Sequence, residues 1–155
     1  MTIAVRRAAL ADVSALQRIA ELAYQKYVPR IGRPPAPMTA DYPAQVAAGV
    51  VWVAVEDGDV VGLLVLHREA DHAELENVAV APAAQGRGVG AALMAHAEAL
   101  ATGWGLAEIR LYTNVAMAEN LSYYPALGYR ETGRGEQDGF QRVFFSKRLD
   151  ASLPG

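Results

Sequence analysis

The chain has 155 residues, no cysteine and a hydrophobic fraction of 52%, which suits one compact domain with a substantial core. The lack of cysteine excludes disulfides, thiolate metal sites and a cysteine nucleophile. Lysine plus arginine at 14 against aspartate plus glutamate at 17 gives a net charge of −3. Because no basic block stands out, nucleic acid is not an expected partner.

The sequence predicts neither a targeting segment nor a membrane segment. The first residues lack a continuous apolar signal core, and no later run approaches the roughly 18 apolar residues of a membrane span. We therefore expect a cytoplasmic protein without a membrane partner. We also expect a single domain over residues 1–150, followed by a flexible tail at 151–155.

The N-terminal part of the chain begins with a strand and a helix. Residues 3–8 alternate like a short strand, and Asp12 then precedes apolar residues at helical spacing up to Tyr27. The stretch from Tyr27 to Pro43 contains five prolines and no periodicity. It predicts a long loop with room for one helical turn, and long loops in small domains often serve binding.

The rest of the chain alternates between strand and helix patterns. Two β-rich runs flank Asp57-Gly58, which is a hairpin signal, and residues 73–80 predict a further strand. Helical spacing then runs from Val89 to a glycine stop at Gly103. The remaining expected elements are a strand at 107–114, a short helix from Met117 to Tyr124 closed by Gly128, and a last hairpin with its turn near Asp138-Gly139.

Glycine occupies positions 86, 88 and 90, where a strand passes into a helix. The glycines could simply let the two elements pack closely, although one glycine would then suffice at a lower cost in backbone entropy. We favour anion binding, because a helix N-terminus offers unsatisfied N–H groups and positive potential. A dinucleotide fingerprint ending at Ala91 is a weak alternative, since APAAQ separates Val80 from the first glycine.

The segment QGRGVG at 85–90 resembles the Q/R-x-x-G-x-G/A signature of the GNAT superfamily of N-acetyltransferases. The preceding NVAVAP and the following helix fit the same block. Downstream, NLSYYPALGYRE is similar to the family's second block, in which a tyrosine precedes a leucine-glycine-aromatic ending. Pro125 departs from this pattern, because the family more often has a charged residue there and proline removes a helical N–H.

The resemblance implies an α/β (α+β) fold of the GNAT type. The central sheet would be mixed and mostly antiparallel, with about six or seven strands, about four flanking helices and a splay between strands four and five. The co-substrate would be acetyl coenzyme A, with its pantetheine arm along the backbone of Val78 and Val80 and its pyrophosphate on the glycine loop. Arg87 could add charge there or merely be solvated. The predicted cofactor-binding residues are Val78, Ala79, Val80, Gln85, Gly86, Arg87, Gly88, Val89, Gly90, Asn120 and Tyr124.

Acetyl transfer to an amine has chemical requirements, and these requirements indicate further candidate residues. An alkylamine with a pKa of about 10.4 is mostly protonated at neutral pH, so a base is useful. Glu74 and Glu76 share one face of the predicted strand by its period of two, and neighbouring carboxylates raise each other's pKa. Glu74 corresponds to the family's glutamate base by position, whereas Glu76 sits closer to the thioester. Both could instead be solvated or paired with arginines.

Tyr124 is the predicted acid for the departing thiolate, because a phenol with a pKa of about 10 is protonated at neutral pH. It could instead be a core aromatic on a short helix. Asn120 lies one turn earlier on the same helix face and suits a hydrogen bond to the cofactor arm. With no cysteine to carry the acetyl group, direct attack in a ternary complex is the expected mechanism.

The acceptor is expected to be a primary amine, either a small molecule or a peptide amine. Aromatic and polar side chains gather in the first helix and the proline-rich loop, where an aspartate could attract an ammonium group. The predicted substrate-binding residues are Tyr24, Tyr27, Arg30, Met38 and Asp41. We expect no metal, since the three histidines are far apart in sequence. A homodimer is compatible with the last hairpin. The alternatives are a silent acyl-coenzyme A-binding module and a nucleotide-binding regulatory module.

Overall fold

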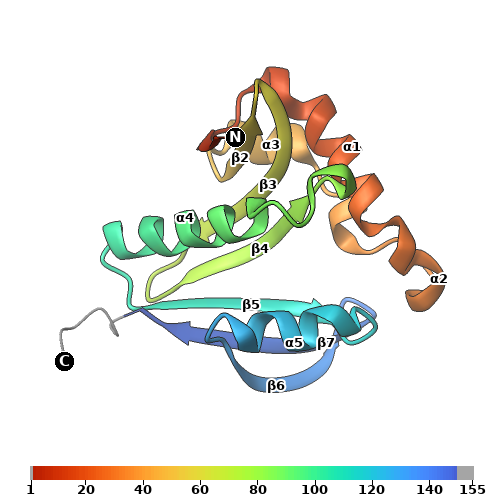
Figure 1. Cartoon of the computed structure of the whole chain (residues 1–155). Coiled ribbons are helices and arrows are strands. Elements are labelled where there is room, and N and C mark those ends of the chain that lie inside the picture. The colour runs from red at the N-terminus through yellow and green to blue at the C-terminus, as the bar shows by residue number, and fades with distance from the viewer. Residues whose placement is uncertain (1, 150–155) are drawn as a thin grey trace. The chain divides into compact units, whose positions relative to one another are not determined.

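The described chain is built on seven β-strands. The computed structural model (Figure 1) describes residues 2–149, so the predicted tail at 151–155 lies outside the described residues. The strand order is β1-β2-β3-β4-β5-β7-β6. The strands are β1 Ile3–Arg7, β2 Val51–Glu56, β3 Asp59–Arg68, β4 Ala73–Val80, β5 Glu108–Asn114, β6 Arg130–Gln137 and β7 Phe140–Arg148.

The α-helices are α1 Val13–Tyr24, α2 Val28–Ile31, α3 Tyr42–Ala47, α4 Val89–Gly103 and α5 Ala118–Ala126. Three of the α-helices, α1, α4 and α5, lie where the periodicity predicts helices, whereas α2 and α3 begin in the stretch predicted as a loop. Short 3-10 helices lie at η1 Leu10–Asp12, η2 Gln25–Tyr27, η3 Ala36–Met38 and η4 Pro82–Ala84. None of the helices described combines the length and the apolarity that crossing a membrane requires.

The prediction of a long loop from Tyr27 to Pro43 is wrong. This segment contains α2 and η3 and enters α3, and each of these short helices has a proline at its first or second position. Proline fits there because its missing N–H would have no intrahelical partner and its fixed φ suits a helix. Three of the five prolines that suggest a loop, Pro29, Pro37 and Pro43, therefore lie in the first turn of a helix.

Residue contacts group the chain into two compact units. The N-terminal unit comprises the residues up to Leu66 together with Asn77–Ala97, and the C-terminal unit comprises His67–Glu76 together with the residues from Glu98 on. The core of the N-terminal unit joins α1 and α3 to β2 and β3 through Leu16, Ile19, Tyr42, Val51, Val53, Leu63 and Val65. In the C-terminal unit, the buried residues include Ile109, Leu111, Tyr124, Tyr129 and Phe145.

Both predicted hairpins are present, and their turns explain the Asp-Gly pairs. Asp57 and Gly58 have φ values of 52° and 86°, and Asp138 and Gly139 have φ values of 55° and 80°. Positive φ at both central residues marks the turn type that matches the twist of antiparallel strands, and aspartate followed by glycine is well suited to it. The pairs β2–β3 and β6–β7 are antiparallel.

The fourth and fifth strands form a parallel pair within the C-terminal unit. Their register joins Ala73, Glu74 and Leu75 to Ile109, Arg110 and Leu111, respectively. Since β5 also pairs with β7 in the antiparallel direction, the sheet is mixed and mostly antiparallel. This confirms the predicted fold class.

Candidate active site

The glycine cluster forms the loop that starts α4. Gly86 and Gly88 have φ values of 83° and 87°, which L side chains rarely adopt, whereas Gly90 already lies in the helix. A Cβ atom at either Gly86 or Gly88 would meet nothing within 4 Å, so the loop is open at both positions. Nε2 of Gln85 donates to the carbonyl oxygen of Val80 at 3.4 Å, which ties the loop back to the end of β4.

Close packing is the role of a different glycine, Gly62 on β3. A Cβ atom there would lie 2.9 Å from Cγ1 of Val89 and 3.1 Å from the carbonyl oxygen of Ala79. Gly62 therefore lets the first turn of α4 approach the sheet beneath the loop. Sequence reasoning missed it, because a lone glycine inside a strand pattern carries only a weak signal of close approach.

Arg87 pairs with a buried carboxylate that the sequence did not suggest. Its Nη1 donates to Oε1 of Glu56 at 2.6 Å, and the side chains of Arg87 and Glu56 are 45% and 5% exposed, respectively. The two residues come from the glycine loop and the end of β2. The sequence alternatives of phosphate binding and simple solvation did not include this pair.

Glu74 and Glu76 on β4 each contact a histidine. Nε2 of His67 lies 2.7 Å from Oε1 of Glu76, and Nε2 of His72 lies 3.2 Å from Oε1 of Glu74. Burial raises the pKa of the Glu74 carboxyl, an effect that His72 partly opposes. Each carboxylate thus has an imidazole within hydrogen-bond distance. Sequence reasoning weighed these histidines only as metal ligands and so missed the pairs.

Both carboxylates also act on the same phenol. Burial is the main cause that raises the pKa of Tyr112, and the charges of Glu76 and Glu74 add to it while Arg142 opposes it. The guanidinium carbon of Arg142 lies 4.0 Å from the centre of the Tyr112 ring. Glu74 and Glu76 therefore sit near one polar aromatic side chain of β5.

A cavity of about 530 Å³ lies on the sheet of the C-terminal unit. Its side chains combine carboxylates, aromatic rings and small polar groups, a mixture that suits a compact polar ligand. The lining residues include Glu74, Glu108, Arg110, Tyr112, Gln137, Phe144 and Ser146. Arg110 donates to Oε1 of Glu108 at 3.2 Å. Of the predicted catalytic residues, Glu74 lines this cavity.

Tyr124 is packed among aromatic rings near the end of α5. Its ring centre lies 5.2 Å from that of Tyr123, 5.9 Å from that of Tyr129 and 5.8 Å from that of Phe145. The residue is 6% exposed. Pro125 follows inside the last turn of the helix, where the broken hydrogen bond costs less than in mid-helix.

Asn120, one turn earlier on α5, is linked to β5. Its Nδ2 donates to Oγ1 of Thr113 at 3.0 Å and lies 3.7 Å from Sδ of Met117. The carboxamide is therefore oriented by the strand beside it.

The predicted acceptor residues have structural partners in the N-terminal unit. The Tyr24 hydroxyl donates to Oδ1 of Asn77 at 2.7 Å and lies 3.1 Å from the carbonyl oxygen of Val78. Asp41 caps α3 by accepting a bond from the backbone N–H of Ala44 at 3.1 Å. Met38 is half-buried at the end of η3.

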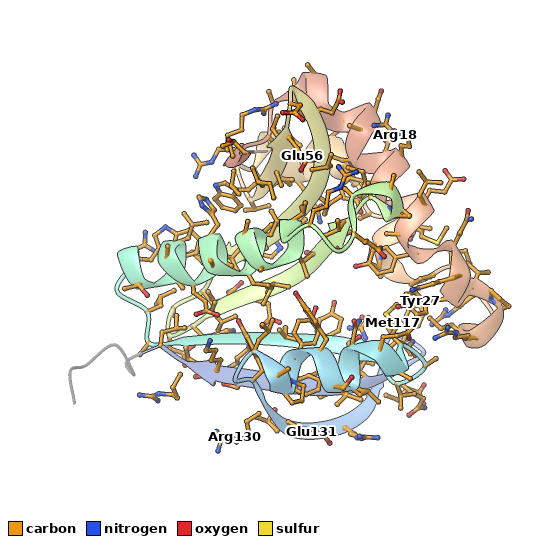
Figure 2. All side chains as sticks on the ribbon, viewed as in Figure 1. Arg18, Tyr27, Glu56, Met117, Arg130 and Glu131 are labelled. Atoms are coloured by element: carbon orange, nitrogen blue, oxygen red, sulfur yellow. The ribbon has the colours of Figure 1, made fainter. Side chains whose placement is uncertain are left out.

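Tyr27, labelled in Figure 2, has two cationic side chains near its ring. It is buried, with Nζ of Lys26 at 5.0 Å and the guanidinium carbon of Arg30 at 5.1 Å from its ring centre. Its ring is therefore largely occupied by contacts within its own segment.

The predicted site residues divide between the two units. The glycine loop, the end of β4 and the predicted acceptor residues belong to the N-terminal unit, whereas the candidate acid and bases belong to the C-terminal unit. Within residues 2–149, no group of three histidine, aspartate or glutamate side chains could hold a metal ion.

The sequence matches a family model described as the acetyltransferase (GNAT) family over residues 16–129. This range contains the glycine loop, the predicted catalytic residues and the second motif block up to Tyr129. A search of curated proteins found no match.

Solved structures with the same fold cover nearly the whole chain. The PaiA N-acetyltransferase from Thermoplasma acidophilum, solved in complex with coenzyme A, is 19% identical with a TM-score of 0.79 and covers 96% of this chain and 99% of its own. The ribosomal-protein-S18-alanine N-acetyltransferase from Escherichia coli is 20% identical with a TM-score of 0.74 and covers 99% of this chain and 97% of its own. N-acetylglutamate synthase from Neisseria gonorrhoeae, complexed with coenzyme A and N-acetyl-glutamate, is 20% identical with a TM-score of 0.75, and the match covers 96% of this chain and 35% of that one.

Proposed function

The chain belongs to the GNAT acetyltransferase family, and from that premise we propose that it transfers the acetyl group of acetyl coenzyme A to a primary amine. The observation that carries the proposal is the loop before α4, in which Gly86 and Gly88 adopt left-handed backbone conformations and leave open space. Such a loop can present backbone N–H groups to a phosphate at the positive end of a helix.

The residues around the loop fit an anionic co-substrate. The Arg87 side chain is 45% exposed, and its guanidinium can donate to phosphate oxygens. We assign the pyrophosphate to Gln85–Gly90 and the pantetheine arm to the backbone of β4 at Val78 and Val80. Asn120 is a further hydrogen-bond donor for that arm.

The chemistry needs a base, an oxyanion donor and an acid. Bound acetyl coenzyme A would supply an activated thioester, whose carbonyl carbon is open to attack by the amine nitrogen. In the proposal, Glu74 or Glu76 removes the proton from the amine, directly or through a water molecule, and a backbone N–H near Val78 stabilises the developing oxyanion. The hydroxyl of Tyr124 gives its proton to the sulfur as the carbon–sulfur bond breaks.

The histidine partners support this assignment of the bases. His67 and His72 lie within hydrogen-bond distance of Glu76 and Glu74, respectively, so each carboxylate is held in place by an imidazole beside it. Both carboxylates are partly exposed, at 33% and 30%, which leaves them accessible to an acceptor or a water molecule.

Calorimetric titration with acetyl coenzyme A, coenzyme A and NAD tests the binding part of the proposal. We expect micromolar affinity for the first two and none for NAD. A panel of small amines and peptide amino termini then tests turnover by release of free thiol. Binding without turnover on any amine would favour a silent acyl-coenzyme A-binding module, whereas NAD binding would favour a nucleotide-binding module.

A further inference from the structure

Glu56 is a buried acid at the end of β2, labelled in Figure 2. The sheet register places it opposite Ile3 of β1 and Asp59 of β3. Its side chain is only 5% exposed, yet Oε1 reaches Nη1 of Arg87 in the glycine loop at 2.6 Å. A carboxylate fixed in the sheet therefore holds a side chain of the loop.

This ion pair is costly to separate. Within residues 2–149, Oε2 of Glu56 is buried without a hydrogen-bond partner, so the Arg87 guanidinium is the main compensation visible for this acid. Separating Arg87 from Glu56 would leave the buried carboxylate without compensation for its charge, which is strongly unfavourable. We therefore expect Arg87 to keep its bond to Glu56 when an anion binds, rather than to exchange one for the other.

The rest of the guanidinium is placed to serve a second anion at the same time. Arginine carries five N–H donors in a rigid fork, and the hydrogen bonds within residues 2–149 use Nη1 of Arg87 alone. The side chain is 45% exposed. Arg87 lies between two glycines with left-handed backbone conformations, Gly86 and Gly88.

From these contacts we propose that Glu56 is a positioning residue that holds Arg87 ready for the pyrophosphate of coenzyme A. The inference rests on the proposed function, because it takes the loop to bind that group. One guanidinium would bridge the buried carboxylate and a phosphate oxygen, so its ordering is completed before the ligand arrives. Pre-ordering of this kind raises affinity by lowering the entropy lost on binding.

Simple electrostatics and positioning make opposite predictions for Glu56→Gln. Removal of a negative charge near a phosphate site should tighten binding if charge alone matters. If Glu56 positions Arg87, the same change should weaken binding of coenzyme A about fivefold, measured by calorimetric titration. The double variant Glu56→Gln/Arg87→Ala, which leaves no buried unpaired charge, should bind about tenfold more weakly than the unchanged chain.

The pair Arg6–Asp12 is a matched control in the same unit. It is 2.8 Å long, with side chains 49% and 10% exposed, and Asp12→Asn should leave the affinity for coenzyme A unchanged. Equal weakening in Asp12→Asn would reduce the effect to general stability and overturn the inference. So would unchanged or tighter binding by Glu56→Gln while the unchanged chain still binds. Absence of binding by the unchanged chain would overturn the proposed function and this inference together.

Discussion

The glycine loop and the acidic face of β4 carry charge in different ways. In the loop, the partly exposed side chain of Arg87 is paired with a buried carboxylate. On β4, two partly exposed carboxylates each lie within hydrogen-bond distance of a histidine imidazole. The first arrangement suits fixed recognition of an anion, and the second suits proton transfer.

The largest expected effect is on the loop. Gly88→Glu places charge and bulk where we assign the pyrophosphate and forces a side chain onto a φ of 87°, so calorimetry should detect no binding of coenzyme A. Gly105→Glu is the control, because Gly105 also has a positive φ, 79°, and open space around its Cβ position. Affinity retained in Gly88→Glu would place the pyrophosphate elsewhere.

Measurements of kcat can distinguish which of the two carboxylates of β4, Glu74 or Glu76, acts as the base. At neutral pH, we expect Glu74→Gln or Glu76→Gln, whichever removes the base, to lower kcat about a hundredfold, since a positioned general base contributes at least that much. The other variant should change kcat by a few-fold at most. If kcat survives in both variants, the proton is removed by a group outside this pair.

A smaller decrease in kcat is expected when the predicted acid, Tyr124, loses its hydroxyl group. Tyr124→Phe should lower kcat about tenfold with nearly unchanged affinity for coenzyme A, because the ring is kept and only the donor is lost. Tyr123→Phe on the same helix is the control and should be neutral. An unchanged kcat in Tyr124→Phe would leave this residue as a core aromatic among Tyr129 and Phe145.

The smallest effect concerns stability and pH. Burial raises the pKa of Glu74 in the folded chain, so the fold favours the protonated form. Stability from this group is complete below its ordinary pKa and is lost as the pH rises through the raised value. Glu74→Gln should therefore raise Tm by about 1–3 °C at pH 7 and not at pH 3. Thermal denaturation at both pH values measures this, with the exposed Glu131→Gln as the control; a gain at pH 3 would contradict it.

Local patterns were sufficient where one residue type satisfies a local geometric demand. The Asp-Gly pairs predicted both hairpins because their turns need positive φ. The same reasoning failed between Tyr27 and Pro43, because proline is compatible both with a loop and with the first turn of a helix.

The sequence by itself determined the order of the elements, the family motif and the residue types available for acetyl transfer, since these depend on periodicity and spacing. Tertiary structure alone decided the partners. Glu56 pairs with Arg87, which is 31 residues further along the sequence. Gly62 has no side chain at the point where α4 packs closely against β3. Such contacts depend on how strands and helices assemble, which no local pattern encodes.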